Sequence, residues 1–266
     1  MVFLIFPLIK LMIESDCYFS NHNLLRIIMT TKIKKLNFND HKEIKIKPGP
    51  HLQTIKAANN VNIIVHEFST AACEMPIIFI KDEDTGRFRS VAVTGLELNE
   101  NVFFKDNFWQ AHFIPGAVAF NPFSLQRFES SDNAVSLELC IDEESEAVNA
   151  NEGEALYLDD GSESTYTSDL RKRMHEYIHF QRVTEKFLEY LVDTELLVQR
   201  SLDVEVSGKT LSLYGMYVVD PKKLENLTDD EFIVLRKRGY LPLIYAHHTS
   251  LGQFNHLSKL KIMAAN

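Results

Sequence analysis

The sequence predicts an α+β fold, with a mixed or antiparallel β-rich N-terminal half followed by helices. Runs of β-branched and aromatic residues separated by turn residues fill residues 32–140. A long amphipathic helical pattern comes next, and shorter strands and helices complete the C-terminal half. Strands and helices that are segregated along the chain indicate α+β rather than alternating α/β organisation.

The first 28 residues differ from the rest of the chain. The apolar run MVFLIFPLIKLMI (1–13) is shorter than the roughly 20 residues that a membrane-spanning helix needs, and it lacks the basic start of a signal peptide. Met29-Thr30-Thr31-Lys32 reads as an ordinary protein start. We therefore interpret residues 1–28 as an over-extended start, or as a short segment that associates with a membrane or packs as a helix, and residues 29–266 as a single domain.

The strands of the β-rich half are predicted from its apolar runs and turn residues. NVNIIVHEF (60–68) and MPIIFI (75–80) are predicted strands. The turn KDEDTGRF (81–88) leads into RSVAVTGLEL (89–98), which predicts a hairpin. The strand pattern continues, around a Pro/Gly loop at 115–123, in NVFF (101–104), FWQAHFI (108–114) and AVSLELCI (134–141).

An acidic stretch separates the two halves. From Glu129 to Leu170 there is no Lys or Arg, whereas 13 residues are Asp or Glu. Such a stretch is typical of a solvated loop, here at about residues 129–168. The alternative is a cation site at DEESE (142–146) or DDGSE (159–163), but neither has the D-x-D-x-D-G spacing of a calcium loop.

The long helix is predicted from a cap at Thr167 or Ser168 to about Val198. A strand–turn–strand pattern follows at 202–220, and Asp220 caps a short helix with Pro221 in first position. The predicted core-facing stripe of the long helix is Leu170, Met174, Tyr177, Ile178, Thr184, Leu188, Leu191 and Val192.

Further along, Thr228 and Glu231 form a capping box, and Gly239 ends that helix. YLPLIYAH (240–247) is predicted as a strand and SLGQFNHLSKL (250–260) as an amphipathic helix.

The long helix contains His175-Glu176-x-x-His179, the H-E-x-x-H spacing of zinc proteases. Both histidines fall on the face opposite the apolar stripe. Their neighbours on that face are cationic, which disfavours a dication: Arg171, Lys172, Arg182 and Lys186. Because no third ligand follows at the required spacing, we reject the zinc protease reading and interpret the motif as a chance occurrence.

Other features of the sequence disfavour several classes of function. A net charge of −9 disfavours nucleic-acid binding, and no Walker loop, Rossmann glycine pattern or G-x-S-x-G occurs. We therefore expect no cofactor and no metal. The three widely spaced cysteines are typical of reduced thiols in a cytosolic protein.

Four residues are candidates for an interaction or chemical site. Trp109 is a core residue or an anchor for a partner. Cys140 is read as a buried thiol rather than a nucleophile, with Asp142 two residues beyond it. His247 is read as a core or hydrogen-bonded histidine rather than a ligand, and on the predicted strand it points away from His248.

The order of several motifs is similar to that of the bacterial SapC family, from about Ile33 to Leu260. The motifs are HEF…EMPIIF (66–79), NVFF…FWQAHFIPGAVAFNPF (101–123), LCIDEES (139–145), ALYLDDGSEST (155–165) and, most specific, LYGMYVVDPKKLENLTDDEFIVLRKRGYLPLIYAHHTSLGQF (213–254). Family members often carry arginines where this chain has Ala119 and Phe120.

The resemblance implies a role near the cell surface. The family is named after a locus for export of a surface-layer protein, and other members are encoded near outer-membrane receptors and tryptophan-halogenase-like genes. Together with the lack of a catalytic signature, the acidic stretch and the aromatic residues near Trp109, it leads us to expect a non-catalytic accessory protein that handles or exports a surface-layer or outer-membrane component with a protein partner. We expect it in the cytoplasm, with or without peripheral association with the inner membrane. The alternative is an enzyme or enzyme partner acting with tryptophan-halogenase-like proteins. The resemblance implies no catalytic residue.

Overall fold

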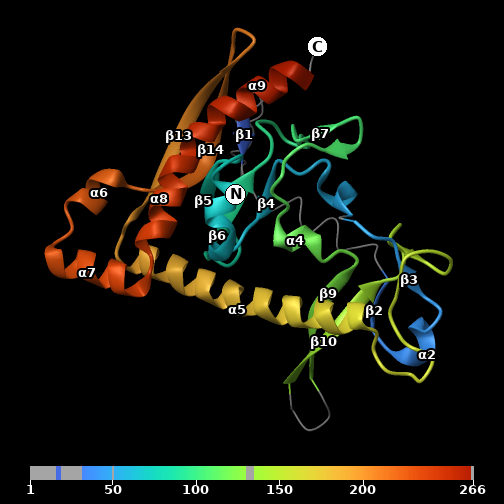
Figure 1. Cartoon of the computed structure of the whole chain (residues 1–266). Helices are drawn as coiled ribbons and strands as arrows, with labels where there is room; N and C mark the ends of the chain where they lie inside the picture. The colour runs from blue at the N-terminus through green and yellow to red at the C-terminus, as the bar shows by residue number, and fades with distance from the viewer. Residues whose placement is uncertain (1–15, 19–31, 50, 130–134, 265–266) are drawn as a thin grey trace, which may run out of the picture.

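The computed structural model describes residues 16–18, 32–49, 51–129 and 135–264, and it has the predicted α+β architecture (Figure 1). The main sheet has the strand order β1-β14-β5-β6-β4, with β13 also paired to β14. Its pairings are antiparallel except for that of β1 with β14. Its strands are β1 (Asp16–Tyr18), β4 (Asn60–Asn62), β5 (Ile77–Lys81), β6 (Phe88–Val93), β13 (Leu197–Val206) and β14 (Lys209–Val219).

Three smaller sheets complete the β structure of the described residues. They are β2 (Ile33–Lys35), β10 (Val135–Asp142) and β9 (Phe123–Glu129); β11 (Val148–Asn149), β3 (Lys45–Ile46) and β12 (Glu154–Ala155); and the pair β7 (Phe104–Lys105) and β8 (Phe108–Trp109). The acidic stretch 129–168 is therefore not one continuous loop, because its described part contains β10, β11, β12 and the start of the long helix. Of residues 1–28, only Asp16–Tyr18 are described, so the interpretation of that segment lies largely outside the structure.

The helices are α2 (Phe38–His41), α3 (Phe68–Ala71), α4 (Gly116–Ala119), α5 (Thr165–Asp193), α6 (Pro221–Glu225), α7 (Asp229–Arg238), α8 (Leu241–Ser250) and α9 (Phe254–Ala264). Short 3-10 turns lie at η1 (Leu52–Ile55), η2 (Val65–Glu67) and η3 (Leu251–Gln253). The caps predicted at Asp220, Thr228 and Gly239 are confirmed. Gly239 has a φ of 72°, the left-handed conformation that favours glycine at a helix end.

The long helix α5 runs from the small sheet β2-β10-β9 to the main sheet (Figure 1). Ser164 rather than Thr167 or Ser168 caps it, accepting a hydrogen bond from the Thr167 N–H. The helix ends at Asp193, earlier than predicted, because β13 begins at Leu197. The predicted stripe is confirmed at Leu170, Met174, Thr184, Leu188 and Leu191, which are buried, and it is wrong at Val192, which is 42% exposed.

Four predicted strands are wrong wholly or in part. In NVFF (101–104) only Phe104 is a strand residue, and in FWQAHFI (108–114) only Phe108–Trp109 are. In the segment 60–68 only Asn60–Asn62 form a strand, and a 3-10 turn follows at Val65–Glu67. The segment 240–247 lies almost entirely in helix α8, with Pro242 near its start, where the missing N–H is not needed. Its buried residues Ile244, His247 and Ser250 recur at three-residue steps, which is a helical period that the apolar composition of the segment concealed.

Helix α8 fills a gap between two strands of the main sheet. Strands β5 and β14 pair at Phe79 and Tyr217, and in a regular ladder Ile77 and Val219 would pair next. Instead, His247 lies between them: its Nδ1–H donates to the Ile77 carbonyl at 2.8 Å, and its Nε2 accepts from the Val219 N–H at 3.1 Å. Ser250 Oγ accepts from the Ile77 N–H at 2.8 Å.

His248 completes this set of bonds, because its Nε2 lies 2.9 Å from the Val219 carbonyl and can donate to it. Side chains of α8 thus bond all four backbone polar groups of Ile77 and Val219. The buried His247 ring is held in one neutral tautomer, and burial lowers its pKa to about 3. The prediction of a core, hydrogen-bonded histidine agrees with this position.

We predict that His247→Leu lowers the free energy of unfolding by about 2–4 kcal/mol at neutral pH. Two buried backbone groups lose their partner, and each unpaired group costs about 1–3 kcal/mol. Urea denaturation of the full chain measures the change. The control is His175→Leu on the exposed face of α5, which should stay within about 0.5 kcal/mol of the wild type. Equal stability of the two variants would contradict the prediction.

The low pKa of His247 also predicts a pH dependence. Between about pH 6.5 and pH 3, the unfolded chain binds a proton at this ring and the folded chain does not, so stability falls as pH falls. The stability difference between the wild type and His247→Leu should therefore shrink by about 2 kcal/mol from pH 7 to pH 5. Urea titrations at the two pH values measure it, and a constant difference would show that the ring titrates normally.

Candidate functional site

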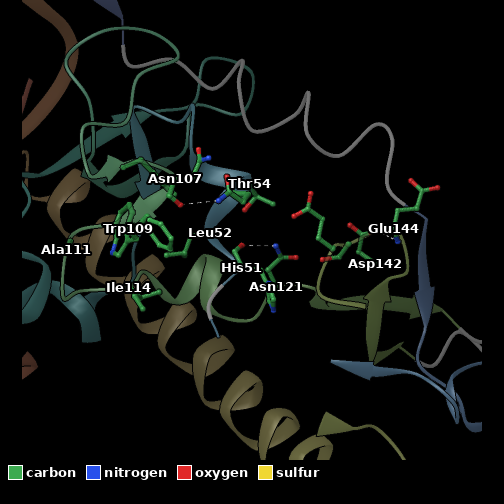
Figure 2. A pocket seen from close by; sticks show the side chains of 15 residues that line it. His51, Leu52, Thr54, Asn107, Trp109, Ala111, Ile114, Asn121, Asp142 and Glu144 are labelled. Carbon is green, nitrogen blue, oxygen red and sulfur yellow. Dashed lines mark hydrogen bonds between the residues drawn. The ribbon is translucent and has the colours of Figure 1, made fainter. Parts of the chain in front are cut away.

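An open cleft of ≈ 820 Å³ lies between η1, the β7–β8 hairpin and the turn that follows β10 (Figure 2). We call it the aromatic–acidic cleft. Its lining residues are His51, Leu52, Gln53, Thr54, Phe104, Asn107, Phe108, Trp109, Ala111, Ile114, Asn121, Asp142, Glu144, Ser145 and Glu146. Figure 2 shows Trp109, Ile114 and Ala111 at one end and Asp142 and Glu144 at the other, with His51 and Asn121 between them.

The β7–β8 hairpin forms the aromatic end. Its two turn residues, Asp106 and Asn107, have φ of 51° and 67°, a left-handed geometry that Asp and Asn tolerate better than most residues. The turn places Phe108 at the rim, 72% exposed. Trp109 is half-buried, its ring centroid 5.4 Å from that of Phe104, and its Nε1–H donates to the Phe113 carbonyl at 3.0 Å. Trp109 is therefore held in place before any ligand arrives.

The hairpin is anchored to neighbouring segments at both ends. Gln53 Nε2 donates to the Asn107 carbonyl at 3.3 Å, and Lys56 Nζ donates to the Asn107 side chain. Beyond β8, the carboxylate of Glu74 accepts the N–H groups of His112 and Phe113 at 3.0 and 2.7 Å. Burial alone would raise the pKa of Glu74, but these hydrogen bonds lower it below its usual value. Glu74 is thus a carboxylate that fixes the loop, not a group open to the cleft.

The middle of the cleft is formed by residues 51–54 and by Asn121, which follows α4. Asn121 Nδ2 donates to the His51 carbonyl at 3.1 Å and joins the two segments. Helix α4 is held by Glu67, which accepts the Gly116 N–H at 2.6 Å and whose pKa is raised by burial. A Cβ at Gly116 would lie 2.6 Å from the ring of Tyr177, so only glycine permits this close approach to α5.

The acidic end is the turn after β10. Asp142, Glu144 and Glu146 line the cleft, whereas Glu143 forms an ion pair with Lys34 at 2.9 Å. The Lys32 ammonium lies 4.0 Å from Glu144, in an exposed pair that contributes little. No Lys or Arg is among the described residues that line the cleft. This end therefore has a negative potential.

The four candidate residues have different positions. Trp109 and Asp142 line the same cleft, whereas Cys140 and His247 do not. Cys140 is buried in β10, and burial raises the pKa of its thiol, as expected for an unreactive cysteine. His247 packs against Phe79 of the larger hydrophobic cluster, with 4.8 Å between the two ring centroids. The structure thus does not gather Cys140, Asp142 and His247 into one site.

Several lining residues were not predicted from the sequence. Phe108 had a local signal, since it directly follows the Asp106-Asn107 turn, but His51, Leu52 and Asn121 reach the cleft only through tertiary packing.

The H-E-x-x-H residues lie on the solvent side of α5. His175 and His179 are both exposed, as predicted, and the His179 ring contacts Phe180 of the same helix. Within the described ranges, no group of three or more His, Cys, Asp or Glu residues could hold a metal ion. A separate finding concerns helix length: none of the described helices is long and apolar enough to span a bilayer.

Comparison with known proteins gave one match. The SapC family model matches residues 36–257, which is most of the chain. Neither the curated proteins nor the solved structures contain a match. The predicted resemblance is confirmed, and the chain belongs to the SapC family.

Proposed function

We propose that this protein is a non-catalytic accessory protein that binds a protein partner through the aromatic–acidic cleft. The partner would belong to the export or handling of a surface-layer or outer-membrane component, in line with what the family resemblance implies. The protein would act in the cytoplasm, with or without peripheral association with the inner membrane. The observation that carries the proposal is the cleft itself, where Trp109 and Phe108 are presented opposite three carboxylates.

The geometry of the cleft supports binding more than catalysis. Ser145 Oγ accepts from the Ala147 N–H at 3.3 Å, while His51 Nε2 donates to the Lys47 carbonyl at 3.0 Å. Hydroxyl and imidazole therefore have separate backbone partners and do not form a nucleophile–base pair in the described hydrogen bonds. A rigid aromatic anchor beside an exposed one is instead typical of protein interfaces.

We predict that a tagged full chain, purified from its native host, recovers secretion components or a surface protein in a cleft-dependent manner. Phe108→Ala should reduce recovery about fivefold or more, because exposed aromatics at interfaces often dominate binding. Phe232→Ala on α7 is the matched control and should leave recovery unchanged, since Phe232 does not line the cleft. Quantitative mass spectrometry of the co-purified proteins measures both.

Two outcomes would overturn the proposal. If no recovered protein depends on Phe108, the cleft is not the partner site. If the cleft-dependent protein is a flavin-dependent oxidoreductase, the alternative role as an enzyme partner of halogenase-like proteins replaces the accessory role.

A further inference from the structure

The chemistry of the side chains that line the aromatic–acidic cleft changes from one end to the other, and this change indicates which kind of ligand the cleft can bind. Trp109 and Ile114 lie at the aromatic end, Asp142 and Glu144 at the acidic end, and the polar side chains of His51 and Asn121 between them (Figure 2). Phe108 of the same hairpin and Glu146 of the same turn also line the cleft. A ligand that fills the whole cleft therefore has to match two different chemistries at its two ends. The volume of ≈ 820 Å³ falls within the range of about 300–1,000 Å³ typical of ligand sites.

The aromatic end favours an apolar or flat side chain. Phe108 is largely exposed to water, and Trp109 is held in position by its hydrogen bond to Phe113. Covering such surfaces removes apolar area from water, and a pre-positioned indole loses little conformational freedom on binding. A charged group at this end would lose hydration without gaining a partner of opposite charge from the described lining residues.

The acidic end favours a cation and excludes an anion. The carboxylates of Glu144 and Glu146 are exposed, and Lys32 is the basic residue that pairs with Glu144 at the edge of this end. The chain also has a net charge of −9, which repels anionic ligands at long range. Phosphorylated ligands, nucleic acids and anionic lipid head groups are therefore poor candidates, whereas Arg and Lys side chains are complementary.

The middle of the cleft fits a polypeptide backbone better than an acyl chain. Gln53, Thr54 and Asn121 supply amide and hydroxyl groups, which can exchange hydrogen bonds with main-chain N–H and C=O groups. An acyl chain would leave these polar groups facing hydrocarbon, which is costly.

From these three regions we infer that the cleft binds an extended peptide segment that carries a large apolar or aromatic side chain and, a few residues away, Arg or Lys. The inference rests on the proposed function and names the chemistry of the partner segment. Two observations together support this inference: the negative charge of the acidic end and the apolar surface of the β7–β8 hairpin.

The chain contains its own reporter of binding, because Trp109 is its sole tryptophan and lines the cleft. Intrinsic fluorescence of the full chain therefore follows occupancy directly. The probes are three tryptophan-free, end-capped peptides, and each is tested in both sequence orders. The first peptide carries Phe and Leu at one end and two Arg at the other. The second has two Glu in place of the two Arg, and the third has Ser in place of Phe and Leu.

We predict that the apolar–basic peptide gives a saturable change in Trp109 fluorescence. The Glu peptide and the Ser peptide should bind at least about tenfold more weakly, and affinity for the Arg peptide should fall as salt rises. The double variant Glu144→Gln/Glu146→Gln should weaken the Arg peptide about tenfold with an unchanged urea midpoint. Asp142 is left intact because its Oδ1 accepts the Glu144 N–H and shapes the turn.

The matched control is Glu176→Gln/Glu185→Gln on the exposed face of α5, which removes the same charge away from the cleft and should leave affinity unchanged. Equal binding of the Arg and Glu peptides, or no fluorescence change with any probe, would overturn the inference. If no probe binds while Phe108-dependent recovery of a partner persists, only the peptide chemistry is wrong. If the Arg peptide binds but no partner depends on the cleft, the proposed function fails instead.

Discussion

The backbone polar groups of Ile77 and Val219 set the central constraint of this structure. They face each other where β5 and β14 separate, deep in the larger core, and a buried N–H or C=O without a partner is costly. Helix α8 resolves this with His247, His248 and Ser250. The position of α8, and of the α9 helix that follows it, therefore depends on a gap in the sheet, and the main sheet in turn depends on α8.

Helix α5 packs against two hydrophobic clusters, one at each end of the helix. Its first turns pack Leu170 and Met174 into a smaller hydrophobic cluster with Ile141, and its last turns pack Phe187 and Leu191 into the larger one. At the aromatic end, Trp109 packs against the larger cluster and also against a third cluster, whose buried residues are Leu52, Ile55, Val61 and Val118. At the acidic end, Asp142 follows Ile141 on β10.

Sequence reasoning succeeded where structure is decided locally. The caps at Asp220 and Thr228 and the β5–β6 and β13–β14 hairpins depend on a few neighbouring residues, and they were predicted correctly. Helix α8 was predicted as a strand because the apolar composition of the segment concealed its helical period. The reason for burying the polar side chain of His247 becomes clear only once β5 and β14 are in place. Trp109 and Asp142 were noticed for their chemistry, but their meeting in one cleft depends on tertiary packing that no local pattern encodes.

The β7–β8 hairpin holds the exposed Phe108 outside the buried clusters. It is a two-residue turn on two short strands, and its tip is tied to η1 through Asn107 alone among the described hydrogen bonds. A change at Phe108 would therefore alter the proposed binding surface and leave the buried clusters in place, whereas Phe104 and Trp109 of the same hairpin pack against those clusters. Under the proposed function, this hairpin is the segment to graft between family members when partner specificity is to be transferred.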